Sequence, residues 1–180
     1  MRKLKPRCLK IKELEDFTGD EPIFIDANIF LYNSLKTPEF VKSCENFLRR
    51  IESGGINGVT SILVLNEVWF KLIVTGVVRE YKVDPRKVAK FINGNPKVLE
   101  TFDRQRDIIN GIEELPNLEI VDIPKDVLSP AKSYSKDYLL LTNDALHLAV
   151  MKQNNITNLA SNDSDFERVD WINLYKPKKE

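Results

Sequence analysis

The sequence has very few of the residues that build disulfide frameworks and multi-histidine metal sites. Its 180 residues include two cysteines, Cys8 and Cys44, and one histidine, His147. Two cysteines so far apart in the chain indicate neither a disulfide framework nor a zinc site, and one histidine cannot form a multi-histidine site. Any metal site would therefore be made of oxygen ligands, which suit Mg²⁺ or Mn²⁺.

Long apolar runs, a glycine-rich loop and an excess of either charge are also missing from the sequence. No continuous apolar segment follows the basic N-terminus, so we expect neither a signal peptide nor a membrane span, and we expect a cytoplasmic protein. The 27 basic and 27 acidic residues exclude a global basic field, so nucleic acid would have to be bound by local patches. Gly54-Gly55 precedes an expected strand instead of following one, so no phosphate-binding glycine loop is indicated.

The hydrophobic pattern alternates between strands and helices, which is typical of an α/β domain with a mainly parallel sheet. Apolar stretches predict strands over residues 23–27, 56–60, 118–123, 158–162 and 171–175, the last of them at an edge of the sheet. Helical spacing predicts helices from residue 28, over 38–52 and 61–76, from 85 and 96, within 126–138, and over 143–153.

One domain is expected to cover residues 22–180, preceded by an N-terminal extension of residues 1–21. The extension carries a basic cluster followed by an acidic one. We interpret it as a solvated terminal arm, with a nucleic-acid contact as the less favoured alternative.

Two aspartates are expected to meet at one edge of the sheet. Asp144 falls in the first turn of the helix over 143–153, with Thr142 as its N-cap, and Asp163 follows the strand over 158–162. A helix of about 10 residues runs roughly 15 Å, and a strand of about 5 residues returns about as far. Asp163 should therefore return to the level of Asp144, with Asp165 close behind.

Two further acids have independent reasons to lie at the same edge. Asp26 ends the strand over 23–27, and open α/β sheets place their ligand sites at the carboxyl ends of strands. Glu67 lies in a helix that is apolar nearly all round, which we expect to be buried between the sheet and another layer. Side chains lean toward the helix N-terminus, so Glu67 can reach back toward that edge. The alternative is a salt-bridged surface residue.

Such a cluster of carboxylates predicts bound protons or a bound divalent cation. At an effective dielectric constant of about 20, two like charges 4 Å apart repel by about 4 kcal/mol. Clusters made only of oxygen ligands suit Mg²⁺ or Mn²⁺, which serve in phosphodiester hydrolysis. His147 is expected to pack beside the core, so no Ser-His-Asp arrangement competes with this interpretation.

A local excess of basic residues lies between residues 79 and 97. Two interpretations are open, a surface that contacts RNA phosphates and a solvated helix face. The candidate RNA contacts are Arg79, Lys82, Arg86, Lys87 and Lys90.

Four segments resemble the acidic motifs of the PIN domain family, in the family's order. They are FIDANIF, SILVLNEV, LTNDALHLAV and LASNDSDFERV, and the resemblance runs from about Ile23 to Pro177. It implies a three-layer α/β/α sandwich on a five-stranded parallel sheet. It also implies that Asp26, Glu67, Asp144 and Asp163 are metal-binding catalytic residues, that Asp165 is an accessory ligand, and that Asn28 and Ser161 are supporting polar neighbours.

Many small members of this family resemble the VapC toxins, which implies a Mg²⁺-dependent or Mn²⁺-dependent endoribonuclease with an RNA substrate, an antitoxin partner and a homodimeric state. The N-terminal extension and a longer helical region around residues 76–117 depart from the compact toxin pattern. A housekeeping RNA-processing nuclease and a non-catalytic RNA-binding or partner-binding module therefore stay open as alternatives. An aspartate-nucleophile phosphatase is disfavoured, because Ala27-Asn28 follows Asp26 where such enzymes need a second acid.

Overall fold

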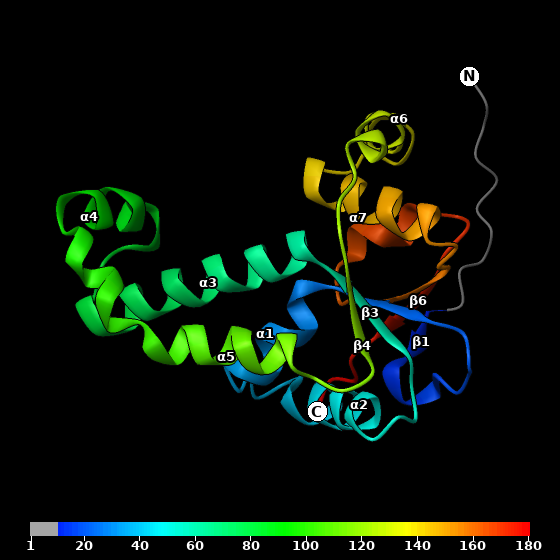
Figure 1. Cartoon of the computed structure of the whole chain (residues 1–180), viewed down its shortest axis with the longest axis horizontal. Coiled ribbons are helices and arrows are strands. Elements are labelled where there is room, and N and C mark those ends of the chain that lie inside the picture. Colours follow the sequence, from blue (N-terminus) through cyan, green and yellow to red (C-terminus); the bar gives the residue numbers. More distant parts are fainter. Residues whose placement is uncertain (1–10) are drawn as a thin grey trace.

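A six-stranded sheet, parallel at every pairing, forms the centre of the computed structural model, which describes residues 11–180 (Figure 1). The strand order is β1-β6-β5-β2-β3-β4. Helical crossovers join the parallel strands that succeed one another along the chain, as parallel pairing requires. The strands are β1 (Lys12–Glu13), β2 (Ile23–Ile25), β3 (Gly58–Ser61), β4 (Leu118–Val121), β5 (Asn158–Ala160) and β6 (Asn173–Lys176).

Helices cover the sheet in the predicted α/β/α arrangement, with α2 and α7 on opposite sides (Figure 1). The α-helices are α1 (Ala27–Ser34), α2 (Val41–Glu52), α3 (Ile62–Tyr81), α4 (Val88–Gly94), α5 (Asp103–Glu113), α6 (Leu128–Tyr138) and α7 (Thr142–Gln153). Short 3-10 helices cover Leu14–Asp16, Pro85–Lys87, Pro96–Thr101, Lys125–Val127 and Ser164–Arg168. Within residues 11–180, none of the helices combines the length and the apolar character that crossing a bilayer demands.

The sheet has one strand more than predicted, because β1 pairs with β6 and takes the edge position that we assigned to the C-terminal strand. The two residues of β1 are charged and exposed, so they carry no strand signal in the sequence. Leu14 and Phe17, which follow, are buried in the main core. The prediction of a solvated arm is therefore wrong for this segment, while residues 1–10 lie outside the described part of the chain.

The central strand β2 ends two residues earlier than predicted, because Asp26 is the N-cap of α1. The Asp26 backbone is extended, and its amide donates to the carbonyl of Ala160 at the end of β5. On the other side, the hydroxyl of Thr60 in β3 donates to the carbonyl of Ile25 at 3.0 Å. These bonds fix Asp26 at the carboxyl edge of the sheet, between β5 and β3.

Helix α3 is longer and less buried than predicted. Its 20 residues span about 30 Å, so it extends well beyond the four-residue strand β3 that precedes it. Only one stripe faces the core, and Ile62, Trp69 and Phe70 are exposed. The expectation that α3 is buried between two layers is therefore wrong.

A helical arm, defined as residues 77–102, projects from the far end of α3 (Figure 1). Val77, Val88, Val98 and Phe102 form a second hydrophobic cluster there, separate from the main core. Within the arm, Lys82 adopts the left-handed conformation and ends α3. The helices predicted from residues 85 and 96 begin at those prolines, with a 3-10 turn first.

Candidate active site

Asp26 is buried at the start of α1 and is held by three hydrogen bonds. One carboxylate oxygen accepts from the amide of Ala27 at 2.7 Å, and the other accepts from the hydroxyl of Ser161 at 2.6 Å and from the side-chain amide of Asn28. Burial raises the pKa of Asp26, and His147 and the hydrogen bonds from Ser161 and Ala27 oppose the rise. The carboxylate is thus fixed in orientation and strained electrostatically.

Asn28 and Ser161 connect the ends of β2 and β5, as their predicted supporting role requires. The Asn28 amide donates to the Ser161 hydroxyl oxygen at 3.0 Å, and the same oxygen accepts from the amide of Asp163 at 3.0 Å. The Asn28 carbonyl oxygen accepts from the amide of Asn162 at 3.1 Å. This network sets the position of Asp163 relative to Asp26.

Glu67 lies on α3, a turn and a half after its N-cap Ser61, and is partly buried. Its carboxylate pairs with Lys71 at 2.7 Å and lies 3.8 Å from His147 Nε2. The neighbouring His147 imidazole is the largest influence that lowers the pKa of Glu67 to about 2, and Lys71 adds to it. Glu67 is therefore fully ionised at neutral pH. Its ion pair with Lys71 is also the contact expected from the alternative interpretation, a salt-bridged surface residue.

Asp144 lies in the first turn of α7, as predicted, although α7 begins at Thr142 and its N-cap is Leu141. Burial raises the pKa of Asp144 to about 6, and the negative charge of Asp163 is the next cause. Asp26 and Glu67 raise it further. Asp144 therefore lies within electrostatic reach of the other three predicted catalytic carboxylates.

The donor set suits a hard divalent cation. Carboxylate oxygens are the ligands that Mg²⁺ and Mn²⁺ prefer, and a positive charge among these acids would remove the repulsion that raises the pKa of Asp144. Across residues 11–180, no three acidic, histidine or cysteine side chains lie close enough to hold one metal ion as they stand. Glu67 is turned to Lys71, and Asp163 accepts from the amide of Asp165, so both make other contacts.

The other predicted site residues lie outside this coupled set. Asp165 forms an ion pair with Arg168 and does not contribute to the raised pKa of Asp144 or Asp26. The five candidate RNA contacts are exposed in and beside the helical arm. Arg79 is twelve residues along α3 from Glu67, about 18 Å at 1.5 Å per residue.

Two residues that contact the site were not assigned to it from the sequence. His147 packs on Phe24 as predicted, with ring centroids 5.8 Å apart, but it also borders Glu67, and neither ring nitrogen has a hydrogen-bond partner within residues 11–180. Lys71 follows Glu67 by four residues, a spacing that places two side chains side by side on a helix. The spacing of four residues could have predicted the contact between Lys71 and Glu67. Nothing in the local sequence predicts the contact between His147 and Glu67.

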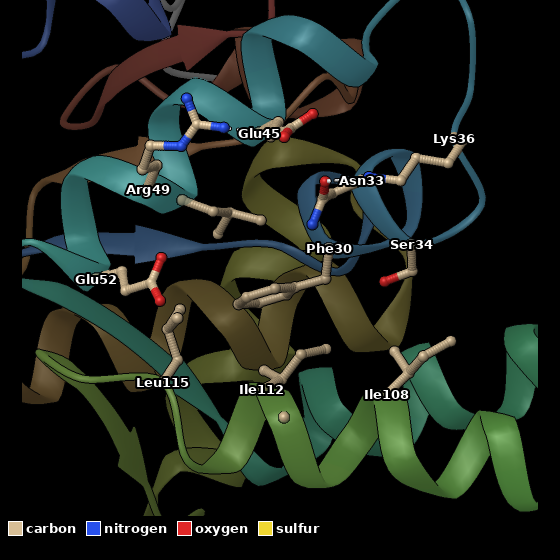
Figure 2. A pocket seen from close by; sticks show the side chains of 12 residues that line it. Phe30, Asn33, Ser34, Lys36, Glu45, Arg49, Glu52, Ile108, Ile112 and Leu115 are labelled. Carbon is tan, nitrogen blue, oxygen red and sulfur yellow. Dashed lines mark hydrogen bonds and ion pairs between the residues drawn. The ribbon is translucent and has the colours of Figure 1, made fainter.

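A separate cleft of about 420 Å³ lies between α1, α2 and α5, and we call it the α2 cleft. Figure 2 shows Ile108 and Ile112 on α5 pointing toward Phe30, with charged side chains at the rim. The cleft is lined by Phe30, Asn33, Ser34, Lys36, Glu45, Leu48, Arg49, Glu52, Ile108, Gly111, Ile112 and Leu115. None of the four coupled carboxylates is among them, so this is a different surface.

Comparison with known proteins adds an independent view of the chain. The family model of the PIN domain matches residues 23–172. Ribonuclease VapC2 of Methanocaldococcus jannaschii is 30% identical over 155 residues, which cover 86% of this chain and 93% of the relative.

Two solved structures share the fold at low sequence identity. VapBC2 from Rickettsia felis, bound to a DNA fragment from its promoter, matches with a TM-score of 0.57 at 17% identity, covering 87% of this chain and 99% of that one. VapC20 of Mycobacterium tuberculosis, a toxin that cleaves the sarcin-ricin loop, matches with a TM-score of 0.56 at 16% identity, covering 85% and 98%.

Proposed function

The chain belongs to the PIN domain family, and from that premise we propose that it is a metal-dependent endoribonuclease of the VapC type. The observation that carries the proposal is the electrostatic coupling of Asp26, Glu67, Asp144 and Asp163 at the carboxyl edge of a parallel sheet. The relative named Ribonuclease VapC2 matches 86% of the chain, so the match has to extend into the helical region of residues 76–117. That region is therefore no argument against a VapC-like activity.

The four carboxylates would hold Mg²⁺ or Mn²⁺ in this proposal. When bound, the cation would supply positive charge to the phosphate and lower the pKa of an attacking water. Asp26 has its orientation set in advance by Ser161 and Asn28. Glu67 is already ionised and needs only to exchange Lys71 for the cation.

Cleavage of RNA tests the proposal directly. We expect cleavage of single-stranded or structured RNA in Mg²⁺ or Mn²⁺, no cleavage in EDTA, and a loss of at least about a hundredfold for Asp144→Asn. Asp107→Asn removes the same charge from an exposed position on α5 and should keep full activity. Equal cleavage by Asp144→Asn, or by wild type in EDTA, would show that the carboxylates do not carry the reaction.

We further propose that an antitoxin protein occupies the α2 cleft. The Rickettsia felis relative is a complex of two proteins, and the apolar floor of the cleft suits an amphipathic segment of a partner. Gly111 lines the cleft with open space beside it, so Gly111→Arg should fill the cleft without strain. Co-expressed with an antitoxin that wild type captures, this variant should lose the complex, and Gly94→Arg, also in open space, should keep it. Equal recovery of the complex by both variants contradicts the assignment.

A homodimer is the third part of the proposal, and the exposed apolar residues of α3 support it. Trp69 and Phe70 follow Ile62 by seven and eight residues, about two helical turns, so the three side chains lie on one side of the helix. Phe70 is 65% exposed, an unusual position for so large an apolar side chain. Light scattering should give a dimer mass for wild type and a monomer mass for Phe70→Asp, with Leu99→Asp as the dimeric control. A monomeric wild type at micromolar concentration rejects this part.

A further inference from the structure

A second cleft, of about 190 Å³, lies where the end of α1 meets the outer half of α3 and the start of α5, and we call it the arginine cleft. It is lined by Ser34, Leu35, Leu72, Thr75, Gly76, Arg79, Glu80, Thr101, Arg104, Gln105 and Ile108. Leu35, Leu72 and Ile108 supply the apolar part, and the remaining side chains are mostly polar. The cleft contains none of the four coupled carboxylates.

Two arginines from different helices line this cleft, and neither has an acidic partner within residues 11–180. Arg79 lies on α3 and Arg104 on α5, and neither forms an ion pair or a side-chain hydrogen bond with any residue of 11–180. Glu80 is the single acidic residue of the lining, and it is also free of ion pairs within that range. The hydroxyls of Ser34 and Thr75 and the amide of Gln105 add neutral donors. The cleft thus offers many donors and a net positive charge.

The walls of the cleft are held at a fixed separation. Gly76 on α3 packs against the start of α5, and a Cβ there would be 2.7 Å from Phe102 Cε1 and 2.8 Å from Gln105 Nε2. Phe102 is buried in the second hydrophobic cluster, so the helices cannot move apart without disturbing the helical arm. The backbone positions from which the two arginine side chains extend are therefore set before any ligand binds, which lowers the entropy lost on binding.

We propose that the arginine cleft binds a backbone phosphate of the RNA, a few nucleotides away from the bond that is cut. Paired guanidinium groups recognise phosphate oxygens through two parallel N–H bonds each. The distance along α3 from Glu67 to Arg79 is about 18 Å, which corresponds to about five stacked nucleotides at 3.4 Å per nucleotide. Arg79 also lies about a third of a turn around α3 from Glu67, so the RNA would pass around the helix.

The surroundings of the cleft favour a polyanion with regularly spaced charges. The exposed residues Lys82, Lys87 and Lys90 continue from Arg79 onto the helical arm, and none of them forms an ion pair within residues 11–180. The chain as a whole has no net charge, so this excess is local. The cleft also adjoins the α2 cleft, with which it shares Ser34 and Ile108, so an acidic segment of a protein partner is the competing ligand.

Affinity for RNA in EDTA tests the inference, which rests on the proposed function but is read without cleavage. Fluorescence anisotropy with a labelled 12-nucleotide single strand should show that Arg79→Ala/Arg104→Ala binds about tenfold or more weakly than wild type. The slope of log affinity against log salt should fall by about 1.4 for two lost contacts. The control Lys125→Ala/Lys136→Ala removes the same charge from exposed sites on and beside α6 and should bind as wild type.

Two further variants and probes separate the alternatives. Arg79→Lys/Arg104→Lys keeps the positive charge but loses the planar guanidinium groups, so its affinity for RNA should be intermediate. A trinucleotide is too short to reach from the proposed catalytic site to the cleft, so it should bind the variants and wild type equally. Thermal shift with inorganic phosphate and binding of poly-glutamate serve as competing probes. The inference is wrong if RNA binds both double-alanine variants equally, or if only phosphate or only poly-glutamate binding depends on the arginines. If Arg79→Ala/Arg104→Ala binds RNA more weakly but wild type cleaves no RNA, the proposal for the arginine cleft stands and the proposed nuclease activity is rejected.

Discussion

Replacing Asp144 with asparagine should make the metal-free protein more stable while it removes activity. The pKa of Asp144 is about 6 against an ordinary value of 3.8. This difference corresponds to about 3 kcal/mol of unfavourable free energy for the ionised carboxylate in the fold. Because Asp144 is only half-buried, solvent screening reduces the effect to about half. Losing a negative charge in the first turn of α7 costs about 0.5 kcal/mol, which leaves a net gain of about 1 kcal/mol.

Thermal unfolding in EDTA at pH 7.5 is the assay. For a domain of this size, about 1 kcal/mol raises Tm by roughly 2–4 °C. The sign of the pH dependence follows from the raised pKa: the folded state binds the proton more tightly, so wild-type stability falls as pH rises from about 4 to about 6. The advantage of Asp144→Asn should therefore be absent at pH 4 and complete above pH 6. Asp107→Asn, on the exposed side of α5, should show no such pattern.

Adding Mg²⁺ or Mn²⁺ should reverse the order of the two proteins. A cation that binds only the folded state stabilises it by about 2.7 kcal/mol at a hundred times its Kd. This exceeds the gain of about 1 kcal/mol from Asp144→Asn, so wild type should become the more stable protein. The reasoning is refuted if Asp144→Asn melts below wild type in EDTA, and the metal assignment is refuted if neither cation raises the wild-type Tm.

Four more substitutions test other parts of the site and the packing of α3 and α5. Glu67→Gln should lower RNA cleavage by at least about a hundredfold in a kinetic assay, because it removes a proposed metal ligand; wild-type rates would remove it from the ligand set. Ser161→Ala takes a hydroxyl donor from buried Asp26, so chemical denaturation should show a loss of about 1–3 kcal/mol, and an unchanged midpoint would contradict this. Gly76→Ala, whose Cβ would be 2.7 Å from a buried phenylalanine ring, should lower stability by about 1–3 kcal/mol. Gly111→Ala, with open space at its Cβ, should raise stability by up to about 1 kcal/mol, so equal effects would reject the steric argument.

The sequence predicted those features of the fold that depend on local pattern. Parallel strands and their crossover helices follow from hydrophobic periodicity. The expectation that Asp163 returns to the level of Asp144 follows from the lengths of the helix and strand between them, and the place of Asp26 follows from its position at a strand end. The strand β1 was missed because its stability comes from pairing with β6 and from Leu14, which is buried by residues far along the chain. A two-residue charged strand has no periodicity that a sequence pattern can detect.

The environment of Glu67 depends on contacts that the local sequence does not specify. An apolar run indicated a helix buried between two layers, but the run belongs to a helix that leaves the sheet, so Ile62, Trp69 and Phe70 are exposed. The partner Lys71 is encoded by a spacing of four residues, whereas His147 arrives from α7, eighty residues later. Contacts between distant elements depend on packing that no single segment specifies, and the arginine cleft between α3 and α5 is of the same kind.

The strand order explains why the carboxylates converge and why the fold tolerates them. Strands β5, β2 and β3 are neighbours. Asp163 and Asp26 lie just beyond the carboxyl ends of β5 and β2, and Ser61 is the last residue of β3, with Glu67 following it on α3. Three of the acids are anchored: Asp26 accepts from Ala27 and Ser161, Asp163 accepts from the amide of Asp165, and Glu67 pairs with Lys71. The electrostatic cost falls on two of them: burial raises the pKa of Asp26, and burial together with the neighbouring acids raises the pKa of Asp144 to about 6. Because the acids are held in place, the repulsion among them is not relieved by movement of the scaffold. A bound cation would remove that repulsion, which adds to the free energy of cation binding.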